Sequence, residues 1–194
     1  MKGTDIVYRE ILYRAIEKKT RVLTQADLSR TLKISLSTVN NALRPLVRMG
    51  AVLVNPRNFH VVDAKKILYY WASIRNLQRD VIYATRVDEP VRTIEKLMPD
   101  DVVFAAYSSY KFLFDDVPAD YSEVYVYGDE SLKQRFPQTK GPFNLFVLRK
   151  DAAIGIYGRK TTIANTFVDL WNLREWYAKE FLKLMEERLY GILE

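Results

Sequence analysis

Between residues 35 and 48 the chain combines an apolar stripe at helical spacing with a polar, cationic opposite face. The stripe comprises Val39, Ala42, Leu43, Leu46 and, we expect, Val47. Asparagine amides can pair with adenine and arginine guanidinium groups with guanine or phosphate, whereas hydroxyls at a helix start suit phosphate. The outward residues are Ser35, Ser37, Thr38, Asn40, Asn41, Arg44 and Arg48. We therefore expect this face to contact double-stranded DNA.

Two neighbouring segments offer further contacts. Asn55-Pro56-Arg57-Asn58 is a strong turn signal between two short apolar segments, so Arg57 and Asn58 are expected at a hairpin tip. Gln25 and Arg30 lie on a short predicted helix before residue 35. We expect these two side chains to contact the DNA backbone.

Caps and periodicity predict the elements that position these residues. Helices are predicted over residues 4–19, over 25–32 behind an N-cap at Thr24, and over 36–49 behind an N-cap at Ser35. The third helix contains Pro45, but its periodicity continues to Gly50, a typical helix stop. Residues 51–54 and 59–62 then alternate as the strands of a hairpin. This order predicts a winged helix-turn-helix.

The segments "LTQADLSRTLKIS", "STVNNALRPLVRMG" and "AVLVNPRNFHVV" resemble the MarR-like and related winged-helix regulators of bacteria and archaea. The resemblance implies that the third helix enters the major groove and that the wing touches the flanking DNA backbone or minor groove.

Asp63 is expected to cap a connecting helix that runs to about Asp80, with Tyr70, Trp71 and Ile74 on its apolar face. Aromatic side chains of this size need cover. The helix either packs on the winged domain alone or also forms a dimer interface, and we favour the second interpretation.

The second half of the chain contains segments with helical spacing and segments with the alternation of strands. Strands are predicted over residues 81–87, 123–127, 144–148 and 152–157, and helices over 91–98, 102–114, 130–136 and 174–189. Phe167–Trp171 is a short apolar segment. Tyr107, Tyr110, Tyr125, Tyr127, Trp171 and Trp176 either line a ligand pocket or, as we favour, belong to the core. Tyr125 and Tyr127 are expected to share one sheet face and to pack on a helix.

The stretches "VFAAYSSYKFLF", "ADYSEVYVYGDE" and "NTFVDLWNLREWYAKEFL" resemble the C-terminal domain of archaeal winged-helix proteins related to the abortive-infection antitoxin (AbiEi) type. The resemblance covers most of residues 81–190 and implies a nucleotidyltransferase-like shape with a regulatory role. A working nucleotidyltransferase needs a Gly-Ser pair at a helix start and spaced carboxylates for two Mg²⁺ ions, and we find neither. Asp115-Asp116 and Asp129-Glu130 are expected on the solvated surface.

Composition excludes several classes of chemistry. The 194 residues contain no Cys and one His, His60, which excludes disulfides, thiolate metal sites and multi-histidine metal sites. No apolar run approaches the roughly 18 residues of a membrane helix. Residues 1–87 hold 16 Lys/Arg and 6 Asp/Glu, a net charge of +10, whereas the other 14 basic and 18 acidic residues give −4. This asymmetry is typical of a nucleic-acid-binding module joined to a unit with another role.

We therefore predict an α+β chain with a winged helix-turn-helix over residues 1–62, a connecting and dimerisation helix over 63–80, and a mixed α/β regulatory or interaction domain over 81–194. We expect a cytoplasmic, homodimeric, sequence-specific regulator of transcription that binds double-stranded DNA. We expect no enzymatic activity, cofactor, metal site or membrane segment. Two alternatives stay open: an antitoxin-like protein that regulates its own expression and neutralises a partner toxin, and a nucleotidyltransferase-type enzyme.

Overall fold

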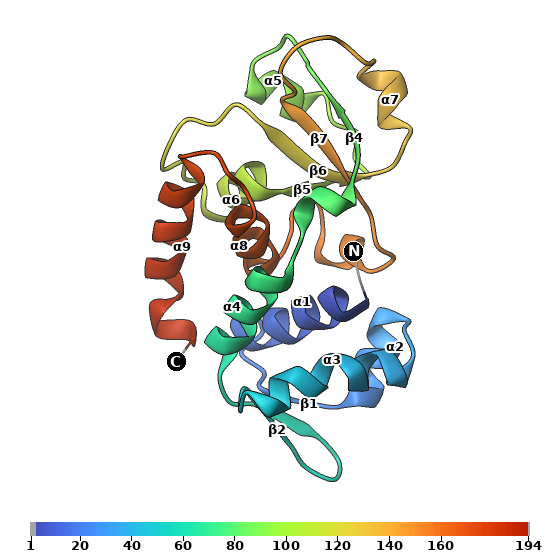
Figure 1. Cartoon of the computed structure of the whole chain (residues 1–194), viewed down its shortest axis with the longest axis vertical. Helices are drawn as coiled ribbons and strands as arrows, with labels where there is room; N and C mark the ends of the chain where they lie inside the picture. Colours follow the sequence, from blue (N-terminus) through green and yellow to red (C-terminus); the bar gives the residue numbers. More distant parts are fainter. Residues whose placement is uncertain (1–2, 194) are drawn as a thin grey trace.

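The second and third helices begin where their predicted N-caps place them. A computed structural model describes residues 3–193 and contains α1 (Gly3–Ile16), α2 (Gln25–Leu32) and α3 (Leu36–Arg48) (Figure 1). The backbone N–H of Asp27 donates to the Thr24 hydroxyl at 3.1 Å, and that of Thr38 donates to the Ser35 hydroxyl at 3.1 Å. Both predicted N-caps are thus confirmed, and α3 continues through Pro45.

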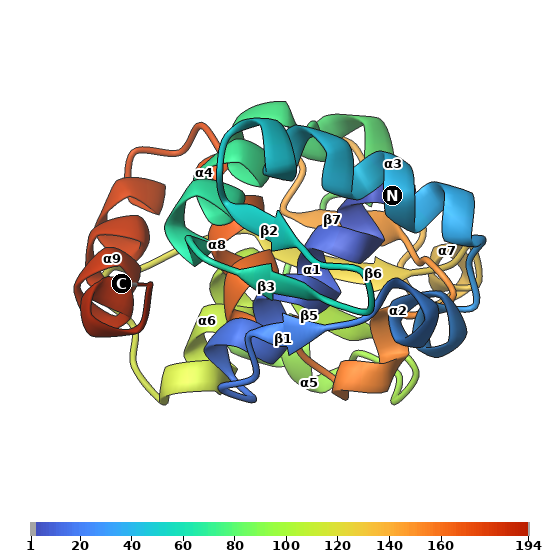
Figure 2. The same cartoon turned by 90° about the horizontal axis from the view of Figure 1, so that it is seen from below.

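A small antiparallel sheet completes this end of the molecule (Figure 2). Strands β2 (Val52–Val54) and β3 (Phe59–Val61) form the predicted hairpin, with Val54 opposite Phe59. The two-residue strand β1 (Val22–Leu23), which the sequence pattern did not indicate, pairs with β3. The fold is a winged helix-turn-helix followed by a mixed region of helices and sheet, as predicted.

Helix α4 (Ala64–Ile74) starts at the predicted Asp63 cap but ends earlier than predicted, and a 3₁₀ turn, η1 (Leu77–Asp80), follows it. The Trp71 side chain is fully buried within this chain, and its Nε1–H donates to Asp5 of α1 at 3.2 Å. Ile74, expected on the buried face, is 43% exposed. The cover that Trp71 needs therefore comes from its own chain.

The second half is built on a four-stranded mixed sheet with strand order β4-β7-β6-β5. Its strands are β4 (Val81–Thr85), β5 (Val103–Ala105), β6 (Val124–Gly128) and β7 (Leu145–Arg149), of which β6 and β7 run parallel. One face packs on α6 (Ala106–Phe114), α8 (Ile163–Trp171) and α9 (Ala178–Leu193). The other face packs on α5 (Val91–Lys96) and α7 (Leu132–Arg135). Tyr125 and Tyr127 share the first face, as predicted.

Two predicted elements of this half are wrong, and a third begins later than predicted. The predicted helix over 102–114 begins as strand β5 and becomes helical only at Ala106, whose φ is +45°. The predicted strand over 152–157 is instead a 3₁₀ turn, η2 (Ile154–Tyr157), because β7 already has a strand on each side. The last helix starts at Ala178, so Trp176 precedes it and is 72% exposed.

Helix α1 joins the two halves. It packs against α3 and α4 on one side and against α8 on the other, and the apolar core runs across it without interruption. Arg9 of α1 is fully buried, and its guanidinium donates to both carboxylate oxygens of Asp151 at 2.9 and 2.7 Å. This ion pair fastens the winged end to the loop that follows β7.

A buried polar network continues from this pair toward α4. Asn165 accepts from Arg9 at 3.5 Å and donates to Asp169 at 2.7 Å, and Tyr127 donates to Asp169 at 3.0 Å. Arg75, at the end of α4, donates to Tyr127 at 3.4 Å and to Asp80 at 2.5 Å. The orientation of the winged domain is therefore set by polar as well as apolar contacts.

No helix within residues 3–193 is long and apolar enough to cross a membrane.

Candidate nucleic-acid interface

The turn between α2 and α3 is held by hydrogen bonds rather than by glycine. Lys33 closes α2 in the left-handed region, with φ +53°. The backbone N–H of Ile34 donates to Ser29 O at 3.1 Å, and the Ser29 hydroxyl donates to Ile34 O at 2.6 Å. These bonds fix the direction in which α3 leaves the turn.

The inner face of α3 is anchored in the core. Val39, Ala42, Leu43 and Leu46 are buried, as their spacing predicts. The Tyr8 hydroxyl of α1 donates to the backbone carbonyl of Ala42 at 3.1 Å. With one face held in this way, the opposite face of α3 is presented to solvent.

That outer face carries most of the predicted contact residues. Ser37, Asn40, Asn41, Arg44 and Arg48 are all exposed. Val47 was expected in the core, but it is 42% exposed. Its position, three residues after Arg44 and seven after Asn40, places it on the same outer face.

Ser35 and Thr38 are hydrogen-bonded to each other at the start of α3. The Ser35 hydroxyl accepts from the Thr38 backbone N–H and lies 2.9 Å from the Thr38 hydroxyl. Both residues therefore support the helix end, where free backbone N–H groups would also favour a phosphate.

The wing turn is closed by its two asparagines. The Asn55 backbone N–H donates to Asn58 O at 2.8 Å, and the Asn55 amide donates to Asn58 Oδ1 at 3.0 Å. Arg57 is exposed at the tip, whereas Asn58 is half-buried. The predicted positions of Arg57 and Asn58 at a hairpin tip are confirmed, and Asn58 also shapes the turn.

A groove of about 250 Å³ separates the wing tip from the start of α2 and α3. The predicted residues Gln25, Arg57 and Asn58 line it together with Leu36 and Asn55. The structure thus brings the helix-turn-helix and the wing into one concave surface, at the lower end of the molecule in Figure 1.

Arg30 lies in the last turn of α2, and its side chain is 80% exposed. Its guanidinium donates to Asp27 at 2.5 Å, and Asp27 also pairs with Arg14 of α1. The hydrogen bond from Arg14 lowers the pKa of the Asp27 carboxyl, and Arg30 lowers it further. Arg30 is therefore a cationic surface residue that also takes part in the contact between α2 and α1.

Leu36 and Asn55 are candidate contact residues that the sequence interpretation did not include. Leu36 is 53% exposed at the start of α3 and lines the groove beside the wing. Helical spacing to Asn40 and Arg44 indicated its outward position, because residues four apart share a helix face. An apolar side chain here suits the methyl group of thymine.

Members of both acidic pairs that the sequence indicated in the second half are engaged with neighbouring surface groups. Asp116 pairs with Arg188 at 2.8 Å, Asp129 accepts from the Ser131 backbone N–H at 2.9 Å, and Glu130 pairs with Lys133 at 3.2 Å. Within residues 3–193, no group of three or more His, Cys, Asp or Glu side chains is placed to hold a metal ion.

The aromatic residues considered for a ligand pocket do not form one set. Tyr107, Tyr110, Tyr125 and Tyr127 are buried, whereas Trp171 and Trp176 are 42% and 72% exposed. The Tyr107 and Tyr125 hydroxyls both donate to Glu175, at 3.2 and 3.4 Å. All four tyrosines are core residues, and the polar ends of Tyr107 and Tyr125 contact the α8–α9 connection.

Comparison with known proteins supports the N-terminal assignment. A family model described as winged helix-turn-helix DNA-binding matches residues 9–52. No curated protein and no solved structure matches the chain. The matched segment runs from α1 into β2, and the structure adds β3 as the second strand of the wing.

Proposed function

We propose that this chain, whose N-terminal region is a winged helix-turn-helix DNA-binding domain, is a sequence-specific regulator of transcription that binds as a homodimer. Helix α3 lies in the major groove of double-stranded DNA, and the turn at residues 55–58 lies along the flanking backbone or minor groove. Two observations carry the proposal: the exposed polar outer face of α3, and the groove that the start of α3 forms with α2 and the wing tip.

The chemistry of this surface suits the two kinds of contact that DNA recognition needs. Asn40, Asn41 and Arg44 offer amide and guanidinium groups to base edges from an exposed helix face. Gln25 and Arg57 line the groove at the start of α3, and Arg30 is exposed on α2; together with the first turn of α3 these groups suit phosphates. The remaining predicted contacts, Ser35, Ser37, Thr38, Arg48 and Asn58, complete the surface.

For the second half we propose a regulatory or interaction role and no catalysis. The support is that Asp116 and Glu130 are paired with neighbouring surface cations and that the Tyr107 and Tyr125 hydroxyls donate to Glu175. No observation favours the toxin-neutralising or nucleotidyltransferase alternatives over this role.

Replacement of Asn41 and Arg44 together by Ala tests the assignment of α3. A random library of DNA duplexes first yields the preferred site, and binding of both proteins to that site is then measured. We expect the affinity to fall more than about tenfold, since each good base contact contributes about 1–3 kcal/mol of discrimination.

A matched control replaces the same kinds of side chain outside the interface. Gln78 and Arg79 are exposed on η1, and the double Ala variant there should bind like the wild type. Wild-type affinity in the Asn41/Arg44 variant, with its fold intact by circular dichroism, would exclude α3 as the recognition helix.

A further inference from the structure

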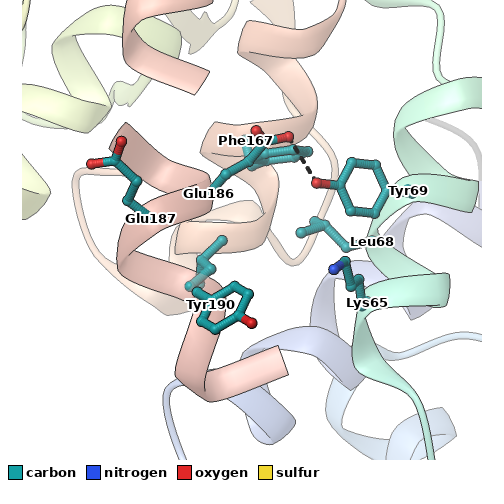
Figure 3. Close-up of a pocket in the computed structure, with 8 residues that line it drawn as sticks. Lys65, Leu68, Tyr69, Phe167, Glu186, Glu187 and Tyr190 are labelled. Atoms are coloured by element: carbon teal, nitrogen blue, oxygen red, sulfur yellow. Dashed lines mark hydrogen bonds between the residues drawn. The ribbon is translucent and has the colours of Figure 1, made fainter. Parts of the chain in front are cut away.

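A groove of about 490 Å³ runs between α4 and α9, outside the DNA-binding surface (Figure 3). Its floor is apolar, formed by the buried side chains of Leu68, Phe167 and Leu189. Tyr69 and Tyr190 stand at its walls, and Tyr190 is 68% exposed. The groove is therefore an apolar depression on the surface of one chain.

The aromatic surface continues beyond the groove. Trp171, which is 42% exposed, contacts both Tyr69 and Phe167, with ring centroids 5.6 and 5.8 Å apart. Exposed tyrosine and tryptophan side chains with an apolar body and a polar end are characteristic of the centres of protein interfaces. This extension beyond the depression favours a macromolecular occupant over a small ligand.

The charges beside the groove are opposite on its two helices. Lys65 lies on α4, in the basic half of the sequence, whereas Glu186 and Glu187 lie on α9. Glu186 already accepts a hydrogen bond from Tyr69 at 2.7 Å, and Figure 3 shows Glu187 turned away from Tyr69. Lys65 and Glu187 are exposed and form no ion pair among residues 3–193. A two-fold axis beside the groove would bring Lys65 of each copy to Glu187 of the other.

Such an isologous contact is self-complementary, because each copy offers the same cation, the same anion and the same aromatic patch. Figure 1 shows α9 along one side of the molecule, with α3 and the wing at the lower end. An axis roughly along α9 would place both DNA-binding surfaces at the same end of the pair. Winged-helix dimers that bind two half-sites need this arrangement.

We propose that the α4–α9 groove, extended by Trp171, is the interface between two copies of this chain. The interface buries Tyr190, Tyr69 and Trp171 at its centre and pairs Lys65 with Glu187 at its rim. The proposal deepens the proposed function, since it names the surface that makes the regulator a dimer.

Sedimentation and light scattering of the full chain without DNA test the interface. The wild type should have twice the 22.7 kDa mass of one chain. Lys65→Glu places like charges opposite each other and should shift the population toward monomer, and Lys65→Glu with Glu187→Lys should restore the dimer. Tyr190→Ala should also weaken the dimer.

A matched control reverses charge on the same helix away from the groove. Lys179 is exposed in the first turn of α9 and does not line the groove, so Lys179→Glu should stay dimeric. A wild type that remains monomeric at high concentration, or a dimer that Lys65→Glu and Tyr190→Ala both leave unchanged, would overturn the proposal. The measurement contains no DNA, so neither outcome bears on whether α3 reads DNA. A monomeric wild type would also remove the homodimer from the proposed function, whereas a dimer that both substitutions leave unchanged would overturn only the choice of this surface. A folded monomeric Lys65→Glu variant should still bind a single half-site.

Discussion

Asp169 is the most deeply placed carboxyl of the polar network that joins the two halves of the chain. Burial raises its pKa to about 7, although Arg75 and the Tyr127 hydroxyl favour the ionised form. The folded state therefore holds a proton at pH values where the unfolded carboxyl, with a pKa near 3.8, has lost it. By linkage, the free energy of unfolding falls as the pH rises from about 4 to about 7.

Asp169→Asn should remove this contribution, because the amide resembles the protonated acid in shape and has no charge to bury. Urea unfolding at several pH values measures the effect. Between pH 4 and pH 7 the unfolding free energy of the wild type should fall by about 2–4 kcal/mol relative to that of the variant. A difference that is constant over this range would contradict the raised pKa.

Single residues of the interface differ in how far sequence could place them. The outward Asn40, Asn41 and Arg44 followed from helical spacing alone, because their buried neighbours define the other face. Val47 was misplaced because an apolar side chain was assigned to the core against its own spacing. The groove shared by Gln25 and Arg57 is set by the packing of the wing against α2, which no local pattern encodes.

At the scale of elements, prediction succeeded where local signals decide. The caps at Thr24, Ser35 and Asp63 each mark a helix start, and the turn at residues 55–58 marks the hairpin. It failed where distant partners decide. Apolar residues 103–105 read as part of the following helix, and only pairing with β6 makes them a strand. Residues 154–157 lack a free strand edge beside β7, and two-residue β1 is too short to show a period.

The buried ion pair between Arg9 of α1 and Asp151 in the loop after β7 fixes the second half of the chain to the DNA-binding end. Asp151→Ala would leave the Arg9 guanidinium buried without its carboxylate partner. Breaking one side of a buried ion pair typically costs about 3–5 kcal/mol of unfolding free energy. We expect a loss of this size in urea unfolding.

Two comparison variants isolate the cause. Arg9→Met with Asp151→Ala removes both charges and should lose less stability than Asp151→Ala alone. Asp101→Ala removes the partner of Lys150 in an exposed ion pair nearby and should cost at most about 1 kcal/mol. If the double variant were the least stable, the penalty would come from lost packing rather than from the unpaired charge.

At the scale of the whole molecule, the uneven charge of the sequence becomes a spatial arrangement. The basic half contains α3, the wing and α4, whereas the mildly acidic half forms β5, β6 and β7 of the larger sheet and the helices around it. Figure 1 places the DNA-binding elements at one end and the larger sheet at the other. The net positive charge thus lies at the end where a polyanion would approach, and the acidic half is set back from it.

This arrangement predicts that the salt dependence of the affinity for DNA distinguishes residues that contact phosphates from residues that contact bases. Affinity for DNA should fall as salt rises, because each neutralised phosphate releases counterions. Arg57→Ala at the wing tip should weaken binding to all duplexes by a similar factor and make the dependence of log affinity on log salt shallower by about one. Asn41→Ala on α3 changes no charge, so it should alter which duplexes are preferred and leave the slope of log affinity against log salt unchanged.

Titrations of both variants against the selected site and a scrambled duplex, over a series of salt concentrations, measure the sequence preference and the salt slope. A change of sequence preference in Arg57→Ala with an unchanged slope would place the wing at the bases instead of the backbone.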